Sequence, residues 1–397
     1  MKRLYIFLNN KLISCDTIVP LVKEICDKQP NFEANFITFE ERTRQAIVEN
    51  VVLFDAIRTI GQLHMLGRAR HTSLSGLLQR IRMVPWLFGL IIEAARGQAL
   101  FLHFKELNFW PLRILPALFP YQTMLAEPTA IGYHPLEKHV SEMMFARRYP
   151  KVSPAGQHLI QFSDHWAVPK DPRTLGRAVY RLPPPFARKH WQEYLAERGA
   201  EYLLDAIEKH EQIAEKAENG VIAYMLSWMG PNNLIRDPNG LPVLFDETLG
   251  ILEETCPNIP VFVKPHPSCS GNSQEYASIQ SICDRHPSLT IILSQLHPIV
   301  LCLKAKIFIA NAYTTTFSMP KYLGIPVIEY SSYRDDILKE TNFGSCRPDM
   351  VDYFINRNPD QLRALMTTLV LKSDHQNRPE FDQSELPAPF WKLFSSY

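Results

Sequence analysis

Groups able to bind a phosphate follow a short apolar segment in the second half of the chain. Residues 259–263 read Ile-Pro-Val-Phe-Val, and Lys264, Pro265, His266 and Pro267 come directly after them. A short β-branched run of this kind is typical of a buried parallel strand, and the carboxyl end of such a strand is where open α/β folds bind ligands. A cation and an imidazole at that position predict a phosphate-binding loop.

Two hydroxyl-rich tracts could complete such a site. Ser270 and Gly271 follow the Lys-Pro-His-Pro turn, and backbone amides of this tract could begin a helix, whose N-terminus favours anions. Thr314, Thr315 and Thr316 lie at the start of another expected helix and offer three hydroxyls to a phosphate or a carboxylate. We therefore predict that both tracts take part in binding an anion.

His-Pro pairs recur in the chain, so the dipeptide alone is a weak signal. It is also found at residues 134–135, 286–287 and 297–298, where we expect mostly caps and turns. His266 differs because an apolar strand precedes it, Lys264 lies two residues before it, and the Thr run follows downstream.

The second half of the chain alternates between strands and helices. The expected strands are residues 221–226, 261–263, 289–293, 307–310 and 326–329, with helices between them. Such alternation is the signature of a doubly wound parallel sheet. The loops 227–237, 264–271 and 311–316 should then lie on one edge of this sheet.

The first half begins as another α/β unit and ends in a long helix. We expect strands at residues 3–8, 34–39, 99–104 and 123–126, and helical structure over most of 41–97. An Ala-, Glu- and Lys-rich helix over 188–218 ends at Asn219 and Gly220, a helix C-cap signal. These patterns predict three parts, which are residues 1–219, residues 220–360, and residues 361–397 as helices that cross back to the first part.

The composition is that of a globular protein, with 46% hydrophobic and 21% charged residues. Seven cysteines include no Cys-x-x-Cys pair, which argues against a zinc site or a disulfide framework and favours a reducing, cytoplasmic compartment. Residues 1–200 carry 26 Lys and Arg against 17 Asp and Glu, and the remaining residues carry 16 against 24. The opposite charges of the two halves support two domains.

A basic and apolar tract lies within the first half. Residues 68–113 carry seven Lys and Arg and two acids, and residues 83–92 are the most apolar stretch of the chain. This stretch is too short to span a bilayer, for which roughly 20 residues are needed. We expect a buried helix with a solvated arginine face, and the alternative is an interfacial helix that rests on anionic lipid. Nucleic-acid binding is disfavoured, because the tract lacks interleaved surface aromatic residues and a known module.

Together these motifs resemble a group of bacterial surface-polysaccharide glycosyltransferases. The resemblance rests on the strand that ends in Lys-Pro-His-Pro at 264–267, the Thr loop at 314–316, and the Gly-x-Pro-Val strand at 324–327. The group contains the GT-B enzymes that use CMP-activated ulosonic acids, notably the retaining β-Kdo transferases of capsule and O-antigen synthesis, and polysialyltransferases share the motif. The resemblance covers mainly residues 221–335.

The resemblance implies an α/β, GT-B-like fold with two Rossmann-like domains facing a central cleft. The C-terminal domain would bind the CMP-activated sugar, and the N-terminal domain a glycan or lipid-linked glycan acceptor at the cytoplasmic face of the inner membrane. The expected donor-binding residues are Lys264, His266, Pro267, Ser270, Gly271, Thr314, Thr315 and Thr316. No metal or other cofactor is implied, because fixed hydrogen-bond donors can stabilise the charge of the departing CMP.

The catalytic residues are harder to place than the donor-binding ones. Retaining members of the group carry a nucleophilic Asp in the loop after the first strand of the C-terminal domain. If the matching position is Asn232 or Asn233, this nucleophile is absent, either because the Asp has been deliberately substituted or because the mechanism differs. Asp237 could serve if the loop is longer, although Asp-Pro-Asn-Gly is also an ordinary turn sequence. Candidates for an acid or base, chosen by residue type alone, are Asp164, His165, Glu127 and His134.

Two other functions stay open beside the transfer of Kdo. One keeps the fold and changes the donor to CDP-glycerol or a UDP-sugar, and it includes the 2-epimerases. The other is a catalytically silent module that binds a nucleotide sugar or scaffolds a synthase, which the Asn-Asn sequence at 232–233 favours.

Overall fold

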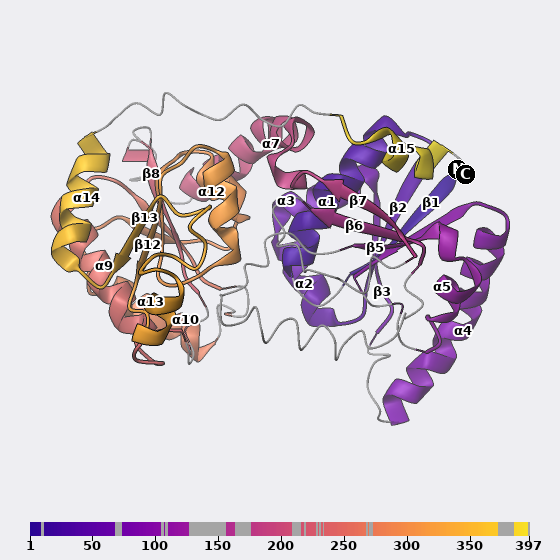
Figure 1. The fold of residues 1–397 in the computed structure, drawn as a ribbon, viewed down its shortest axis with the longest axis horizontal. Coiled ribbons are helices and arrows are strands. Elements are labelled where there is room, and N and C mark those ends of the chain that lie inside the picture. Colours follow the sequence, from indigo (N-terminus) through magenta and orange to yellow (C-terminus); the bar gives the residue numbers. More distant parts are fainter. Residues whose placement is uncertain are drawn as a thin grey trace. The chain divides into compact units, whose positions relative to one another are not determined.

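The computed structural model describes residues 1–8, 12–67, 74–104, 107, 110–126, 156–162, 176–208, 216–217, 220–227, 229, 232, 234–266, 269, 273–371 and 385–395. They form two compact units (Figure 1). The first contains the described residues up to Gln192 together with residues 385–395, and the second contains those from Glu193 to residue 371. Each unit is built on a parallel sheet covered by helices.

Within its described residues, the first unit has seven parallel strands in the order β3-β2-β1-β4-β5-β6-β7. The strands are β1 (Lys2–Phe7), β2 (Phe32–Thr38), β3 (Gly61–Met65), β4 (Ala99–His103), β5 (Thr123–Ala126), β6 (His158–Phe162) and β7 (Ala178–Leu182). The α-helices are α1 (Leu12–Lys28), α2 (Glu41–Glu49), α3 (Val51–Ile60), α4 (Leu74–Ala95), α5 (Ile114–Leu118) and α15 (Ala388–Ser395), and the 3-10 helices are η2 (Pro120–Gln122) and η4 (Pro185–Ala187). The strand order reverses between β1 and β4.

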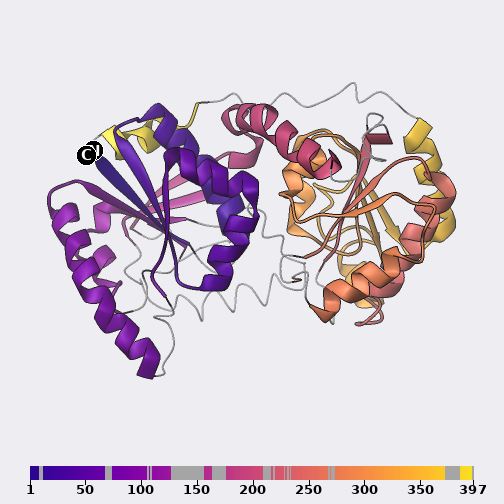
Figure 2. The same ribbon diagram turned by 180° about the vertical axis from the view of Figure 1, so that it is seen from behind.

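Both faces of β1 are apolar, which fits its place near the middle of the sheet. Tyr5 and Phe7 pack in a cluster with Phe101 of β4 and with Leu87 and Leu90 of α4. Helix α4 lies on the opposite side of the sheet from α1 and α3 (Figure 2). The helices of the first unit therefore cover both faces of its sheet.

Strand β3 corrects the sequence interpretation, which extended helical structure across it. Its residues 61–65 pair in parallel with β2, where Gly61 lies opposite Ala34. A Cβ on Gly61 would lie 1.7 Å from the Ala34 carbonyl oxygen, so only glycine fits there. Because this approach depends on a strand distant in sequence, helical periodicity alone could not show it.

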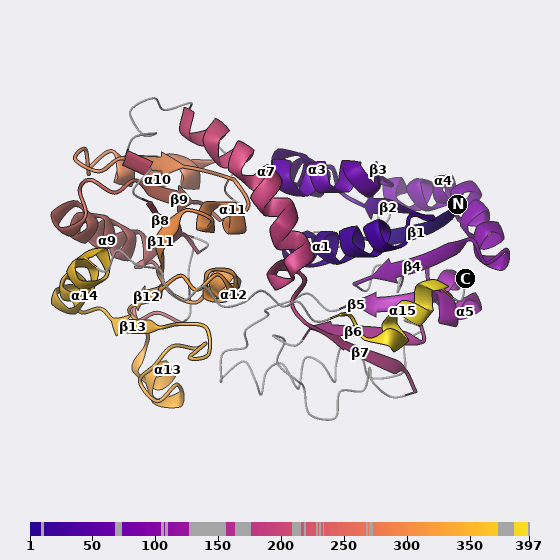
Figure 3. The same ribbon diagram turned by 90° about the horizontal axis from the view of Figure 1, so that it is seen from above.

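The described part of the second unit has six parallel strands in the order β10-β9-β8-β11-β12-β13. The strands are β8 (Val221–Met225), β9 (Val261–Lys264), β10 (Ile291–Leu293), β11 (Ala305–Ala310), β12 (Val327–Ser331) and β13 (Tyr353–Asn356). The α-helices are α7 (Lys189–Glu208), which begins in the first unit, α9 (Leu241–Thr255), α10 (Gln274–Cys283), α11 (Pro298–Cys302), α12 (Ser318–Tyr322), α13 (Asp335–Glu340) and α14 (Pro359–Leu371), and η5 (Thr315–Phe317) is a 3-10 helix. Helices α9 and α14 lie on one side of the strands and α11 and α12 on the other (Figure 3).

The strand order of the second sheet reverses between β8 and β11. This reversal is the topological switch point of a doubly wound sheet, the place where such folds bind ligands. The alternation of strands and helices that the sequence predicts for this half is confirmed, and the loops that follow β8, β9 and β11 leave adjacent strands at the same edge.

The last described helix packs on the first unit. Phe394 of α15 contacts Phe32 of β2 with ring centroids 5.8 Å apart, and Phe390 contacts Tyr180 of β7 at 5.9 Å. By contact, the two units divide between residues 192 and 193, inside α7, whereas the sequence places the boundary after residue 219. The limits 1–219, 220–360 and 361–397 stay a prediction.

Candidate functional site

The candidate site is the carboxyl edge of the second sheet at its switch point. Strand β9 ends at Lys264, and the backbone amide of Leu226 donates to the Lys264 carbonyl at 3.0 Å, so the loops after β8 and β9 begin side by side. Across the switch point, the Ser227 hydroxyl lies 3.2 Å from the Asn311 carbonyl and 3.3 Å from the Tyr313 carbonyl. Hydrogen bonds thus join the starts of all three loops.

A buried amide fixes the loop that follows β11. Asn311 is 2% exposed, and its Nδ2 donates to the Tyr330 carbonyl at 2.9 Å and to the Thr248 hydroxyl at 3.2 Å. Its Oδ1 accepts a hydrogen bond from the Tyr224 hydroxyl. The next residue, Ala312, is buried with a positive φ of 64°, a conformation that non-glycine residues rarely adopt. The network therefore holds the chain in a sharp turn at the switch point.

Asn311 was not among the residues that the sequence selects for the site. The only local signal is a polar amide directly after an apolar strand, at residues 305–310. Its partners come from β8, α9 and β12, so no short motif contains them.

Lys264 is almost fully buried, with 7% of its surface exposed. Its Nζ donates to the Gln295 carbonyl at 3.0 Å, and Gln295 Nε2 donates in turn to the Cys269 carbonyl at 3.3 Å. The Cys269 amide donates to the His266 carbonyl at 2.8 Å, which closes the turn after β9. A buried ammonium acts in a medium of low dielectric constant, where its attraction for an anion is stronger than in water.

His266 is half-buried beside this ammonium. Burial, together with the charge of Lys264, lowers the pKa of the His266 imidazole below its ordinary value. The ring is therefore neutral at pH 7 and can donate one N–H to an anion, so it acts as a hydrogen-bond donor rather than as a second cation. Pro267, Ser270 and Gly271 lie outside the described residues.

The Thr loop forms the helix start that the sequence predicts. Thr314 precedes η5 and caps it, because its hydroxyl accepts from the Thr316 amide at 3.3 Å. The two hydroxyls of Thr314 and Thr316 also bond to each other at 2.9 Å. The backbone of Thr315 is part of η5, and its side chain lies outside the described part of the chain.

The residues proposed for catalysis are placed only in part. Asn232 forms a turn, in which its Oδ1 accepts from the Leu234 amide at 2.9 Å. Asp237 is exposed and its Oδ1 accepts from the Asn239 amide at 3.0 Å, which is the ordinary turn that its sequence also allows. Asn233 and Asp164 lie outside the described residues, as do His165, Glu127 and His134. The catalytic roles stay predictions.

Two of the other His-Pro pairs have structural roles. His297 caps α11, because its Nδ1 accepts from the Ile299 amide at 3.2 Å. His286 lies between Glu253 and Asp246, with a ring nitrogen 3.1 Å from a carboxylate oxygen of each. The expectation of caps and turns is confirmed for His297, and His134 lies outside the described residues.

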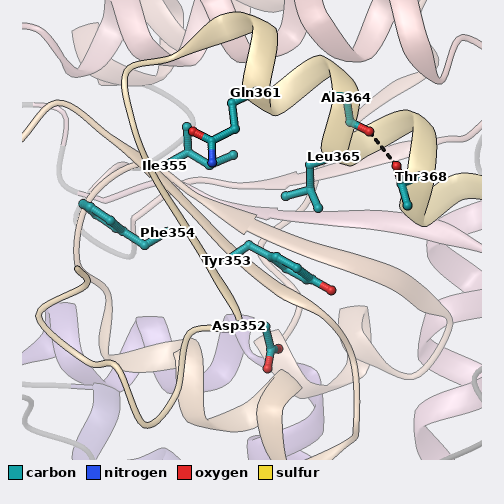
Figure 4. A pocket seen from close by; sticks show the side chains of 8 residues that line it. All are labelled: Asp352, Tyr353, Phe354, Ile355, Gln361, Ala364, Leu365 and Thr368. Atoms are coloured by element: carbon teal, nitrogen blue, oxygen red, sulfur yellow. Dashed lines mark hydrogen bonds between the residues drawn. The ribbon is translucent and has the colours of Figure 1, made fainter. Parts of the chain in front are cut away.

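A cavity of about 430 Å³ lies elsewhere in the second unit, between the edge strand β13 and α14 (Figure 4). Asp352 at its rim is already bound, since its carboxylate accepts from Lys321 and from the Val327 amide. The remaining lining is mostly apolar or aromatic side chains, with Gln361 and Thr368. Because β13 is separated from β11 by β12, this cavity is distinct from the switch point.

No potential metal-binding group of three or more His, Cys, Asp or Glu side chains occurs among the described residues. All seven cysteines are described, and each is a buried free thiol.

No protein-family model and no curated protein matches the chain. Several solved structures are similar to the chain. The UDP-bound MnaA of S. aureus aligns with 100% of this chain and 97% of its own, at 10% identity and a TM-score of 0.53. The UDP-N-acetylglucosamine 2-epimerase of Neisseria meningitidis, bound to UDP-GlcNAc, aligns over 100% and 98% at 12% identity and 0.52. A UDP-bound ugt transferase from Siraitia grosvenorii aligns over 100% and 99% at 10% identity and 0.52. At these identities the likeness establishes the fold, which is GT-B-like with two Rossmann-like domains, as the sequence predicts.

Proposed function

We propose that the chain is a glycosyltransferase that moves Kdo or a related ulosonic acid from its CMP donor to a surface-polysaccharide acceptor, with retention of configuration. One observation carries the proposal. Lys264 and His266 lie at the carboxyl end of β9, next to the switch point between β8 and β11, where a doubly wound sheet binds nucleotides. The Lys-Pro-His-Pro and Thr motifs that match CMP-dependent enzymes therefore lie in loops of the same sheet edge.

The chemistry of this edge suits a departing nucleotide phosphate. When the bond to the sugar breaks, negative charge develops on CMP, and donors that are already in place stabilise it without reorganisation. The buried ammonium of Lys264 supplies charge, and the neutral imidazole of His266 supplies an N–H. Thr314, Thr315 and Thr316 are proposed to bind the phosphate or the sugar carboxylate, and Pro267, Ser270 and Gly271 to complete the loop. No metal is needed for these roles.

The nucleophile is proposed to come from the loop after β8. Asn232 and Asp237 are both engaged in local turns, so the loop would have to rearrange around the donor before Asp237 could attack. A test is to replace Asn233 by Asp and to look for a covalent sugar adduct by mass spectrometry with CMP-Kdo. An adduct would assign the position. If there is neither an adduct nor a gain in transfer, Asn233 is not the nucleophile position.

Thermal unfolding with CMP, CDP, UDP and GDP tests the donor. We expect CMP alone to raise the melting temperature, and His266→Ala to weaken CMP binding roughly 10- to 100-fold, the loss of one hydrogen bond to a charged group. His286→Ala is the matched control, because it removes an imidazole of another His-Pro pair in the same unit but away from the switch point. A CMP affinity that is unchanged in His266→Ala would exclude that residue from the site, and the absence of a response to all four nucleotides would exclude the transferase functions that use them.

A UDP-sugar enzyme, such as a 2-epimerase, is the second candidate. The observation in its favour is that similar structures with TM-scores of 0.52 and 0.53 hold UDP or UDP-GlcNAc. Stabilisation by UDP and not by CMP would decide for it, and stabilisation by CDP would favour a CDP-glycerol enzyme. Binding of CMP without turnover of CMP-Kdo would instead indicate a silent module.

The acceptor and the compartment complete the proposal. The first unit would bind a glycan or lipid-linked glycan, and the reaction would take place in the cytoplasm, at the inner membrane. The basic and apolar tract 68–113 supports a membrane-anchored acceptor, because clustered Lys and Arg are attracted to anionic lipid.

A further inference from the structure

We infer that the outward face of α4 is a docking surface for an anionic lipid bilayer. The inference rests on one part of the proposed function, the reaction at the inner membrane, and names the surface that would meet the lipid; it does not depend on which nucleotide the second unit binds. It rests on the exposed side chains of α4, on the charges beside them, and on a neighbouring group of exposed aromatic residues.

The outward face of α4 is apolar where a solvated helix would be charged. Among the side chains that the structure describes in α4, five large apolar ones are exposed, and at about 100° per residue they fall within roughly 120° of the helix circumference. They are Leu78 at 52% exposure, Ile81 at 56%, Val84 at 45%, Phe88 at 64% and Ile92 at 40%. The core needs none of them, because the opposite face already supplies Met83, Leu87, Leu90 and Ala94, each at most 6% exposed. A second apolar face on a surface helix indicates an interaction site.

The expectation of a buried helix with a solvated arginine face is met in part, because one face of α4 is buried and Arg82 and Arg96 are exposed. The exposed side also carries the apolar stripe, and the two arginines lie along one flank of it. The acid of α4, Glu93, is neutralised from the sheet, since its carboxylate lies 2.5 Å from Arg3 Nη1 and accepts from the Tyr5 hydroxyl at 2.7 Å. The charge presented beside the apolar stripe is therefore positive.

A second set of exposed apolar and aromatic residues adjoins the C-terminal end of α4. Gln122 Nε2 of η2 donates to the Ala94 carbonyl at 2.8 Å, which attaches the α5–η2 segment to the last turn of α4. Four side chains of this region are exposed, namely Trp110 at 58%, Ile114 at 40%, Leu118 at 55% and Tyr121 at 65%. Trp and Tyr favour the headgroup level of a membrane, because their rings have an apolar body and a polar group.

The combination of an apolar stripe with a basic flank favours anionic lipid over a second copy of the chain. A two-fold contact between antiparallel copies of α4 would place the arginine flanks of both helices on the same side of the interface, where like charges repel. A lipid surface instead offers negative headgroups to Arg82 and Arg96 and acyl chains to Phe88 and its neighbours. None of the described helices is long and apolar enough to cross a membrane, so α4 would lie in the plane of the interface.

Vesicle flotation of the full chain tests the inference. We expect binding to vesicles of equal parts phosphatidylcholine and phosphatidylglycerol, little binding to phosphatidylcholine alone, and weaker binding as salt is raised. Phe88→Ser should weaken partitioning about tenfold, because the ring no longer enters the acyl region. Arg82→Gln combined with Arg96→Gln should weaken it roughly 25-fold on phosphatidylglycerol vesicles and leave phosphatidylcholine unaffected.

Phe343→Ser is the matched control, since Phe343 is 70% exposed but belongs to the second unit. It should bind vesicles as the unchanged chain does, and unfolding curves of all variants check that each is folded. The inference is overturned if the unchanged chain does not float with anionic vesicles or if Phe88→Ser floats as well as Phe343→Ser. It is also overturned if sedimentation shows a dimer that Phe88→Ser abolishes while no vesicle binds, which would assign the face to a second copy.

Discussion

Each unit buries a carboxyl group, and the two carboxyls have different partners. In the first unit, Glu24 of α1 accepts two hydrogen bonds from Arg188, at 2.5 Å from Nε and 2.7 Å from Nη2, and both side chains are at most 5% exposed. In the second unit, Glu329 of β12 is 0% exposed, its Oε1 accepts a hydrogen bond from the Tyr333 hydroxyl, and its Oε2 has no hydrogen-bond partner among the described residues. A paired guanidinium compensates for burial of a charge, whereas a single hydroxyl does not.

The consequence is a difference in charge state between two similar sheets. The central strands of both run in the same order, β3-β2-β1-β4 and β10-β9-β8-β11. Yet the first unit keeps an ion pair between α1 and the residue before α7, while burial raises the pKa of Glu329 to about 7, despite the opposing hydrogen bond from Tyr333. The same topology therefore accepts a buried carboxylate or a buried carboxylic acid, and the neighbours decide which.

The largest expected effect is that of breaking the ion pair. Arg188→Met leaves Glu24 buried with its main partner removed, which should lower the free energy of unfolding by about 3–5 kcal/mol. Urea denaturation followed by circular dichroism measures it. Arg198→Met is the matched control on α7, because Arg198 pairs with Glu201 in solvent and its loss should change stability little. Equal losses of stability in the two variants would show that the buried Glu24–Arg188 pair contributes no more to the free energy of unfolding than an exposed pair does.

The protonation of Glu329 predicts a pH dependence in the other unit. Its folded pKa of about 7 lies above the ordinary 4.5, so between these values the folded chain holds a proton that the unfolded chain releases. The contribution of Glu329 to the free energy of unfolding is therefore greatest at low pH. It falls by roughly 3 kcal/mol as the pH rises from about 4.5 to 7. Glu329→Gln removes the titrating carboxyl. Between pH 5 and pH 8, the free energy of unfolding of the variant should therefore rise relative to that of the unchanged chain by about this amount, which urea denaturation at each pH measures.

Tyr333→Phe sharpens this test. It removes a hydrogen bond that favours the charged form of Glu329, so the pKa of the carboxyl should rise further and the loss of stability should extend to higher pH. If the difference between Glu329→Gln and the unchanged chain is independent of pH, Glu329 is already ionised and the contrast with Glu24 disappears.

The sequence predicts best those features that depend on neighbours along the chain. The strand that ends at Lys264, the turn at Asp237 and the helix start at Thr314 were all foreseen, because an apolar run, an Asp-Pro-Asn-Gly turn and a hydroxyl cap are local signals. The alternation of strands and helices in the second half was likewise predicted from local apolar runs. The nucleotide and the catalytic residues are not tested by the fold, and they stay predictions.

The features that the sequence did not reveal depend on distant neighbours. Strand β3 was interpreted as helix because the need for Gly61 arises only beside Ala34. The sequence did not show which face of α4 meets the sheet, because both of its faces are apolar and periodicity does not distinguish them. Asn311 was missed because its partners come from β8, α9 and β12.

Asn311→Ala tests whether a neutral buried hydrogen-bonding group contributes less to the free energy of unfolding than a buried ion pair does. The substitution leaves the Tyr224 hydroxyl and the Tyr330 carbonyl without this partner, which should cost about 2 kcal/mol, below the effect expected for Arg188→Met. Asn358→Ala is the matched control. It removes an exposed bond to the Gln361 amide at the start of α14 and should cost about 1 kcal/mol or less. Because Asn311 also fixes the turn at the switch point, its loss should weaken CMP binding, while Asn358→Ala should not. A stability loss without a change in CMP binding would mean that the loop after β11 does not contribute to the donor site.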